Sequence, residues 1–276
     1  MQLIDGRKLA ARIRADVKTT VATLPAKPGL AIVLVGDDPA SHTYVRLKAK
    51  AAEDIGLHFA RYDFPATATE AEITERIQAL NTDPAIHGIV VQLPLPAPLN
   101  PDRIVNTIAP SKDADGFLRA NLDRFRTDAS ALPPALCEGI WRLIASTGVT
   151  PSRAAVLANS TTFGEPMAGL LTRKKFDVQI SYPPFHNVAA LTRAADVIVV
   201  AVGRAKFLTA ENVKSGAVII DVGFNHVGDK TVGDADAESL QNLPGWLTPV
   251  PGGVGPVTVV MLLKRTVELL YRHGDH

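Results

Sequence analysis

The alternation of short apolar runs with helical patterns constrains the fold of this chain more than any other feature. Several runs consist almost entirely of Val, Ile, Ala and Leu, as expected of strands that are buried on both faces. The strand-like runs are Leu30–Val35, His58–Phe64, Gly88–Leu93, Ala154–Leu157, Asp177–Ser181, Val197–Val202, Ala217–Val222 and Trp246–Pro249. The helical patterns between and around them are Gly6–Leu24, Ser41–Ile55, Glu70–Asn81, Pro134–Ser146, Glu165–Lys175, Asn187–Ala194 and Pro256–His273. This order predicts an α/β protein built from parallel βαβ units.

The composition excludes several classes of function. The 276 residues suffice for two domains with their own cores, and the net charge of +1 gives no reason to expect a nucleic acid or a membrane surface as partner. No apolar run approaches membrane-spanning length, the N-terminus lacks a signal-peptide pattern, and the single Cys137 fits a reducing compartment, so we expect a cytoplasmic protein. The seven His residues lack metal-ligand spacing, so we expect no metal site.

A Tyr and a Lys lie one helical turn apart in the segment P-A-S-H-T-Y-V-R-L-K, residues 39–48. Tyr44 and Lys48 would share one face of a helix. A buried Lys beside a Tyr hydroxyl can transfer protons, because the pKa of Lys shifts readily on desolvation. Most pairs at this spacing are simply solvated surface residues.

A second segment, V-Q-L-P-L-P at residues 91–96, ends a buried strand with two prolines. The chain must turn there, at the carboxyl end of a strand, where α/β proteins usually place their sites. A Gln inside this run needs a hydrogen-bond partner. Gln92 therefore either holds a loop or contacts a partner such as Lys48.

Two further segments carry polar or glycine-rich patterns. K-D-A-D-G at residues 112–116 places two carboxylates before a Gly, and an ordinary turn explains Asp113. P-V-P-G-G-V-G-P-V-T at residues 249–258 has three Gly within four residues, which allows close approach of the backbone to a ligand, although a plain turn would share the pattern. We expect Pro256 to be the first residue of the last helix.

These four segments, in this order, resemble the methylenetetrahydrofolate dehydrogenase/cyclohydrolase family. The resemblance is strong in the first 120 residues and at the C-terminus. It implies two three-layer parallel-sheet domains with a cleft between them, the second Rossmann-like. Residues 1–118 with 257–276 would form the folate-binding catalytic domain, and residues 119–256 the dinucleotide-binding domain.

The resemblance also implies roles for individual residues. Lys48 would handle the proton of the hydrolytic step, Tyr44 would orient Lys48, and Gln92 would tune its proton affinity. Asp115 would anchor the pterin ring, since a carboxylate accepts two adjacent N–H groups. The other expected contacts are Ser41, Gly252, Gly253 and Pro256 for the folate, and Ala158, Asn159, Ser160, Gly164, Val202, Gly203 and Thr258 for the dinucleotide.

The expected phosphate loop departs from the family pattern, which is close to G-R-S-x-x-V-G-x-P. The chain has A-N-S-T-T-F-G-E-P, so Ala158 and Asn159 replace Gly and Arg. Ala158 can close the turn only if its φ is negative. We expect residues 164–166 to open the next helix, with Glu165 at the end that faces a pyrophosphate.

The segment after the next strand, residues 181–185, has no acidic residue for a ribose diol and no Arg for a 2′-phosphate. Arg173 to Lys175 lie at a helix end, where cations need no ligand. Whether Arg204 touches a phosphate is open, and a solvated loop Arg is the favoured interpretation. We therefore expect weak NADP binding with little preference over NAD.

The leading functional hypothesis is a bifunctional enzyme of one-carbon folate metabolism, which supplies purine biosynthesis. It would oxidise 5,10-methylene-tetrahydrofolate with NADP, NAD not being excluded, and hydrolyse the methenyl product to 10-formyl-tetrahydrofolate. The alternative is a cyclohydrolase-only or catalytically altered paralogue, and a silent folate-binding paralogue is disfavoured because four catalytic-type residues are all present. We also expect a homodimer that pairs through the nucleotide domain, with Phe176, Tyr182 and Phe185 as apolar surface candidates.

Overall fold

The computed structural model describes residues 1–228 and 230–273, and these fold into two compact units. The six-stranded unit contains residues 1–10 and 136–258, and the three-stranded unit contains residues 11–135 and those from 259 on. The boundaries expected at residues 118 and 256 differ from these in two ways. The helix after residue 118 and the loop that follows it fold with the three-stranded unit. Residues 1–10 belong to the six-stranded unit, because strand β1 pairs with β11.

The three-stranded unit has a parallel sheet in the order β3-β2-β4. Its strands are β2 (Gly29–Val35), β3 (His58–Phe64) and β4 (Gly88–Val91). The helices that lie wholly or mainly in this unit are α1 (Gly6–Ala22), α2 (Pro39–Ile55), α3 (Glu70–Thr82), α4 (Pro101–Val105), the 3-10 helix η1 (Pro110–Lys112), α5 (Arg119–Thr127) and α10 (Val254–His273).

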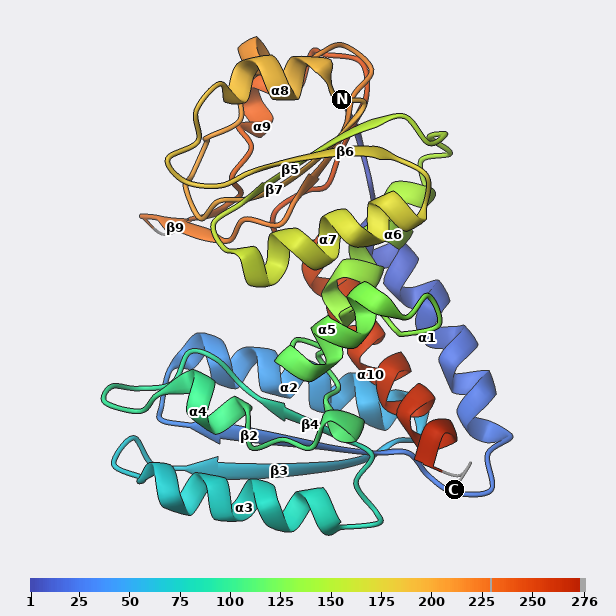
Figure 1. The fold of residues 1–276 in the computed structure, drawn as a ribbon, viewed down its shortest axis with the longest axis vertical. Helices are drawn as coiled ribbons and strands as arrows, with labels where there is room; N and C mark the ends of the chain where they lie inside the picture. Colours follow the sequence, from blue (N-terminus) through green and yellow to red (C-terminus); the bar gives the residue numbers. More distant parts are fainter. Residues whose placement is uncertain (229, 274–276) are drawn as a thin grey trace. The chain divides into compact units, whose positions relative to one another are not determined.

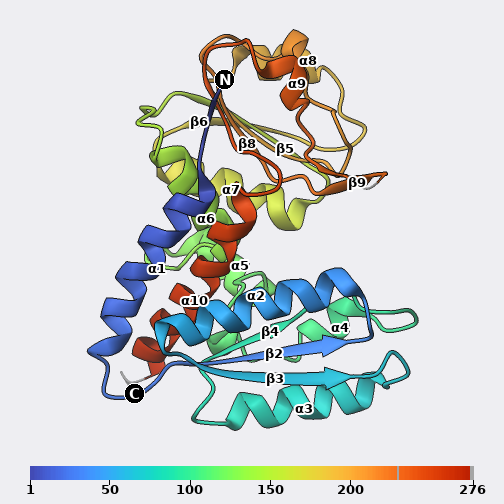
Figure 2. The same cartoon turned by 180° about the vertical axis from the view of Figure 1, so that it is seen from behind.

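The core of this unit lies on both faces of β2, all of whose residues are buried. On one face the strands pack against Ile73, Ile77 and Leu80 of α3. Helix α2 covers the opposite face (Figures 1 and 2), which gives three layers. Asp38 caps the start of α2 by accepting a hydrogen bond from the Ser41 N–H at 2.7 Å, and Gly56 ends the helix in the left-handed conformation.

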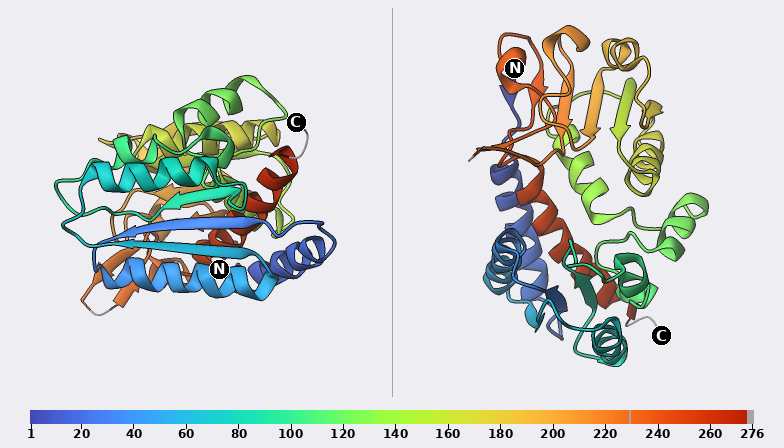
Figure 3. Two further views of the ribbon diagram at one scale, coloured as in Figure 1. Left: turned by 90° about the horizontal axis from the view of Figure 1, so that it is seen from below. Right: turned by 90° about the vertical axis from the view of Figure 1, so that its left-hand side faces the viewer.

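The six-stranded unit has a parallel sheet in the order β1-β11-β8-β7-β5-β6, seen nearly edge-on in the right-hand view of Figure 3. The strands are β1 (Gln2–Leu3), β5 (Arg153–Ala158), β6 (Asp177–Ser181), β7 (Val197–Ala201), β8 (Val218–Asp221) and β11 (Trp246–Leu247). An antiparallel hairpin adds β9 (Asn225–Val227) and β10 (Lys230–Val232). From β5 onward the sheet follows a doubly wound order whose direction of winding reverses between β5 and β7.

Helices cover both faces of this sheet. They are α6 (Ala135–Ala145), α7 (Thr161–Arg173), α8 (Val188–Ala194), the 3-10 helix η2 (Ala210–Asn212) and α9 (Ala237–Leu240). Figure 1 shows α6 and α7 on one side of the sheet and α8 and α9 on the other. The central strands are buried as a result, except at Arg153 and Ala201 on the ends of β5 and β7, as their continuous apolar sequences predict.

Helices α7 and α10 begin earlier than expected. Helix α7 begins at Thr161 rather than at Gly164, because Ser160 is extended and serves as the N-cap residue, so Pro166 lies inside the helix. Helix α10 begins at Val254, two residues before Pro256. The short strands β1, β9 and β10 were not expected, since two or three residues are too few to show a period.

Candidate functional site

Lys48 and Gln92 form the centre of a polar site in the three-stranded unit. The Lys48 Nζ donates a hydrogen bond to the Gln92 Oε1 at 2.9 Å. The Gln92 Nε2 donates to the Leu93 carbonyl at 2.8 Å, and the Gln92 backbone N–H donates to the Val33 carbonyl at 2.8 Å. The end of strand β4 thereby holds the amide with its oxygen toward Lys48.

Helix α2 carries Tyr44 one turn before Lys48, and both side chains are half-buried. Burial lowers the pKa of Lys48, and the negative charge of Asp115 offsets part of that effect. Burial raises the pKa of Tyr44, so its phenol stays protonated at neutral pH. The site therefore combines an amine that loses its proton more readily than a surface Lys with a hydroxyl that keeps its own.

Asp115 shares this site. Burial raises the pKa of its carboxyl group, while the positive charge of Lys48 lowers it, and the smaller effects of Asp113 and Arg265 oppose each other. Asp113 has a different role, since its carboxylate accepts the Gly116 N–H at 2.8 Å, the Leu118 N–H at 2.9 Å and the side-chain amide of Asn121 on α5 at 2.9 Å. The two carboxylates of K-D-A-D-G thus have different roles: Asp113 holds the loop, and Asp115 interacts electrostatically with Lys48.

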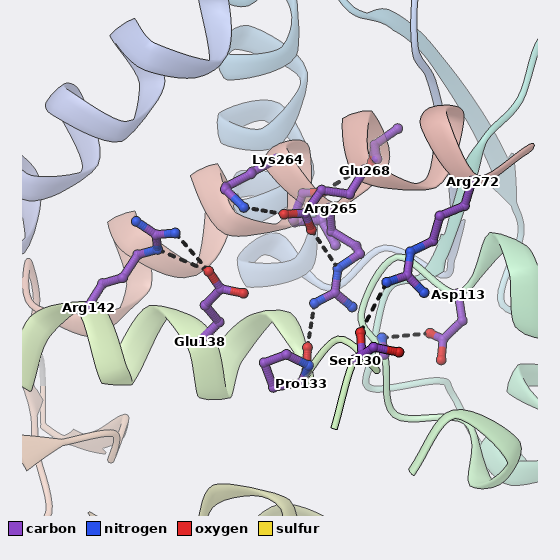
Figure 4. Close-up of polar contacts among 12 residues, drawn as sticks. Asp113, Ser130, Pro133, Glu138, Arg142, Lys264, Arg265, Glu268 and Arg272 are labelled. Carbon is purple, nitrogen blue, oxygen red and sulfur yellow. Dashed lines mark hydrogen bonds and ion pairs between the residues drawn. The ribbon is translucent and has the colours of Figure 1, made fainter. Parts of the chain in front are cut away.

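Basic side chains brace the loop that carries Asp115. The Lys112 Nζ donates to the carbonyls of Leu80 and Asp83 at 2.9 and 2.7 Å, which satisfies the C-terminus of α3. Figure 4 shows Arg265 of α10 donating to the Pro133 carbonyl, and Arg265 also pairs with Glu268. The expected motif residue Lys112 is therefore structural.

Ser41 is buried at the start of α2. Hydrogen bonds from its backbone and side chain lower the pKa of Asp38, the N-cap residue. Ser41 thus helps to fix the helix that carries Tyr44 and Lys48, which is a contribution to the site that sequence reasoning did not identify.

A second group of expected site residues meets in the six-stranded unit, at the carboxyl ends of β5 and β7. Ala158 ends β5 opposite Ala201 of β7, and the Asn159 N–H donates to the Ala201 carbonyl at 3.0 Å. A side chain at Gly203 would lie 3.6 Å from the Asn159 Nδ2. Ala158 is not among the described residues with positive φ, so Ala closes this turn without strain. Residues 158–160 and 202–203 thus lie together where ligands bind in doubly wound sheets.

The start of α7 is suited to an anion. The Ser160 side chain makes no capping hydrogen bond among the described residues, so the first-turn N–H groups of α7 lack that partner. Gly164 lies further along the helix, and a side chain there would collide with the ring of Tyr182. The packing of Tyr182 therefore explains Gly164, and Glu165 lies in the second turn of α7 rather than at its N-terminus.

Two buried carboxylates that the sequence did not single out hold the loop after β7. The Asp234 carboxylate accepts the backbone N–H groups of Val202, Gly203 and Arg204 at 2.6, 3.0 and 2.9 Å. Asp221 in turn accepts the N–H of Asp234 at 2.9 Å. Burial, opposed by hydrogen bonds from the backbone, raises the pKa of Asp221 to about 6. No repeating sequence pattern identifies such residues, because they form hydrogen bonds to loops rather than lying on one face of a helix or strand.

The glycines of the loop before α10 have different structural explanations. Gly252 has a φ of 113°, and a side chain at Gly253 would collide with Thr248. Within 4 Å of a side chain at Gly255 there is no other described atom, so the fold itself does not require Gly there. Pro256 lies in the first turn of α10, and the Thr258 hydroxyl donates to the carbonyl of residue 254 at 3.1 Å.

The aromatic residues expected at a dimer surface are largely packed inside the unit. Phe176 is buried against Trp141, with ring centroids 6.2 Å apart, so its assignment to an exposed surface was wrong. Lys174 lies 5.2 Å from the Trp141 ring, at the C-terminal end of α7 and therefore far from the β5 turn. Phe185 contacts Phe207 at 5.3 Å.

Within residues 1–228 and 230–273, no helix has the length and apolar character needed to cross a membrane. The same residues contain no cluster of three or more His, Cys, Asp or Glu that could hold a metal ion.

Comparison with known proteins places these observations in one family. Residues 4–115 match the model of the tetrahydrofolate dehydrogenase/cyclohydrolase catalytic domain, and residues 134–274 match that of its NAD(P)-binding domain. The chain is 46% identical to the bifunctional protein FolD of Bordetella avium, covering 98% of each chain, and 43% identical to that of Moorella thermoacetica, covering 98% of this chain and 99% of the relative.

Solved structures agree. The bifunctional FolD of Campylobacter jejuni aligns with a TM-score of 0.93 at 36% identity over 99% of both chains. The Trypanosoma brucei FolD, solved with NADP and an inhibitor, aligns with a TM-score of 0.94 at 34% identity over 99% of this chain and 98% of that one.

Proposed function

Because the chain belongs to the tetrahydrofolate dehydrogenase/cyclohydrolase family, we propose that Lys48 transfers the proton of its cyclohydrolase reaction. The protein is a bifunctional enzyme of one-carbon folate metabolism. It oxidises 5,10-methylene-tetrahydrofolate to the 5,10-methenyl form with NADP and hydrolyses that product to 10-formyl-tetrahydrofolate. The single observation that supports the role of Lys48 is its hydrogen bond to Gln92 in a site that lowers its pKa.

The hydrolysis needs a group that exchanges a proton near neutral pH. In its neutral form Lys48 would accept a proton from the water whose oxygen bonds to the methenyl carbon. The adduct would then break its bond from that carbon to N5, with the proton of its hydroxyl group passing to N5. One water is consumed and one proton is released overall.

The neighbours of Lys48 would tune this exchange. Gln92 offers a neutral acceptor, so it can hold Lys48 in either protonation state. Tyr44 would orient the amine and the substrate. The Asp115 carboxylate would accept two N–H groups of the pterin ring. The roles of Ser41, Gly252, Gly253 and Pro256 toward folate stay predictions.

NADP supplies the hydride acceptor of the oxidation when it is bound. The residues present fit such a group, because two elements meet at the reversal between β5 and β7. They are the turn at residues 202–203 and the start of α7, where the Ser160 side chain makes no capping hydrogen bond among the described residues. We propose that Asn159, Ser160 and Gly203 line this site. Ala158, Val202 and Thr258 would contribute backbone to its walls. Gly164 leaves space for the ring of Tyr182 behind the site.

The remaining assignments are proposals of the same kind. We propose a cytoplasmic homodimer that serves purine biosynthesis through its 10-formyl product. Exposed apolar side chains of the six-stranded unit, such as Ile180, Phe224 and Val227, could supply the dimer contact. Sedimentation at micromolar concentration tests it, and a single species near 29.4 kDa would reject the dimer.

The two activities can be tested separately on the purified protein. One assay follows NADPH formation from methylene-tetrahydrofolate, and the other follows loss of methenyl-tetrahydrofolate absorbance without dinucleotide. We expect both signals. Hydrolysis without NADPH formation would instead favour the cyclohydrolase-only alternative.

A further inference from the structure

The protein uses NADP, yet the turn after β5, residues 158–160, carries no cation. A 2′-phosphate is usually held by a cation, most effectively by the planar fork of a guanidinium. Another cation at the same edge of the sheet is therefore the natural candidate for this contact.

Arg204 is held by aromatic rings at that edge. Its guanidinium carbon lies 4.9 Å from the ring centroid of Phe207 and 6.0 Å from that of Phe185. A guanidinium stacked on rings is restrained while its outer N–H groups can still donate. The rings thus hold the cation without neutralising it.

The two rings come from different loops. Phe185 follows β6 and Phe207 follows β7, and these strands flank β5. The guanidinium therefore stands where loops from both neighbours of β5 meet. In doubly wound sheets the adenosine end of a dinucleotide binds beside the first two strands of the unit, here β5 and β6, and an Arg nearby can receive the 2′-phosphate.

The backbone at Arg204 is also fixed. Its N–H donates to the Asp234 Oδ1 at 2.9 Å, and Gly203 before it has a φ of 68°. Because the Asp234 carboxylate takes up three consecutive N–H groups of this loop, these groups do not need a phosphate to satisfy them. The loop presents a side-chain cation rather than a cradle of backbone donors.

Two other cations of this unit, Lys206 and Lys174, are engaged. Lys206 lies 3.4 Å from an Asp236 carboxylate oxygen and 3.7 Å from one of Glu238. Lys174 packs on Trp141 at the opposite end of α7. We infer that Arg204 binds the 2′-phosphate of NADP and makes the enzyme prefer NADP over NAD.

The test compares Arg204→Met with the matched control Lys206→Met, which removes a cation two residues away. Dissociation constants for NADP and NAD are measured by calorimetry, and kcat and KM of the dehydrogenase are measured with each cofactor. Loss of a charge-assisted hydrogen bond should weaken NADP binding by about ten- to a hundredfold in Arg204→Met. NAD binding should change less than about twofold. The NADP affinity of Arg204→Lys should lie between those of the wild type and Arg204→Met. Lys206→Met should bind both cofactors as the wild type does.

This inference rests on NADP use by the wild-type enzyme. Unchanged NADP affinity in Arg204→Met, or equal loss of NADP and NAD, would overturn it while leaving the dehydrogenase in place. A wild-type protein that forms no NADPH would overturn both. Methenyl-folate hydrolysis, which needs no dinucleotide, reports in every variant that the protein is folded.

Discussion

Asp115 of the three-stranded unit and the two buried carboxylates of the six-stranded unit are used in opposite ways. In the three-stranded unit, Asp115 lies beside Lys48, and each shifts the pKa of the other. In the six-stranded unit, Asp221 and Asp234 are buried, and their carboxylate oxygens accept hydrogen bonds from backbone N–H groups. A carboxylate paired with a titrating amine serves chemistry, and one saturated by backbone donors serves shape. The difference separates a carboxylate that tunes a proton-exchanging amine from carboxylates that fix a loop.

The largest expected effect follows from removing the amine. Lys48→Met keeps the length of the side chain but cannot exchange a proton, so methenyl-folate hydrolysis should fall by about 100- to 10,000-fold. The rate is followed by loss of methenyl absorbance, with Lys50→Met, an exposed Lys on the same helix, as the control. Retention of more than about a tenth of the rate would remove Lys48 from the chemistry.

Asp221 should make the stability of the six-stranded unit depend on pH. Its pKa is about 6 in the folded protein against 3.8 ordinarily, so the folded state holds the proton more tightly. The free energy of unfolding should therefore fall as pH rises from about 4 to about 6, by about 3 kcal/mol for some 2 pKa units.

Both Trp residues, Trp141 and Trp246, belong to that unit, so Trp fluorescence during urea unfolding reports on it alone. Asp221→Asn lacks the titrating group and should lose this part of the pH dependence. Identical pH profiles in the two proteins would show that Asp221 titrates normally.

Asp115→Ala should weaken folate binding by about 1–3 kcal/mol, the usual cost of leaving ligand donors unpaired. NADP binding should stay unchanged, because the dinucleotide residues lie in the other unit. Calorimetry with each ligand separates the two, and equal weakening of both would assign Asp115 a structural task.

The smallest effect concerns the pH optimum. The Asp115 charge raises the pKa of Lys48, so Asp115→Asn should lower it further. If neutral Lys48 is the active form, the rise of hydrolysis with pH should move to lower pH in this variant. A shift to higher pH would contradict the assigned charge coupling.

Much of this was predictable from sequence where a pattern had a period or a known motif. Continuous apolar runs gave the buried strands, and the i, i+4 spacing placed Tyr44 beside Lys48. The start of α7 was misplaced because Pro166 was taken as a helix opener, whereas an extended Ser160 began the helix earlier. Asp234 was missed because its partners are backbone groups 30–32 residues away, which no local pattern encodes.

The strength and selectivity of NADP binding stay predictions. The absence of a cation near residues 159 and 181–185 predicted weak, unselective binding. Arg204 lay in an A-V-G-R motif that resembled an ordinary loop, and only the rings of Phe185 and Phe207 from two separate loops distinguish it.

The division of work between the units is tested most directly by crossing two variants with two measurements. Methenyl-folate hydrolysis and NADP binding are measured on both Lys48→Met and Arg204→Met. We predict that Lys48→Met loses hydrolysis by at least about a hundredfold and binds NADP like the wild type. Arg204→Met should hydrolyse normally and bind NADP about ten- to a hundredfold more weakly. Loss of both properties in either folded variant would contradict the account.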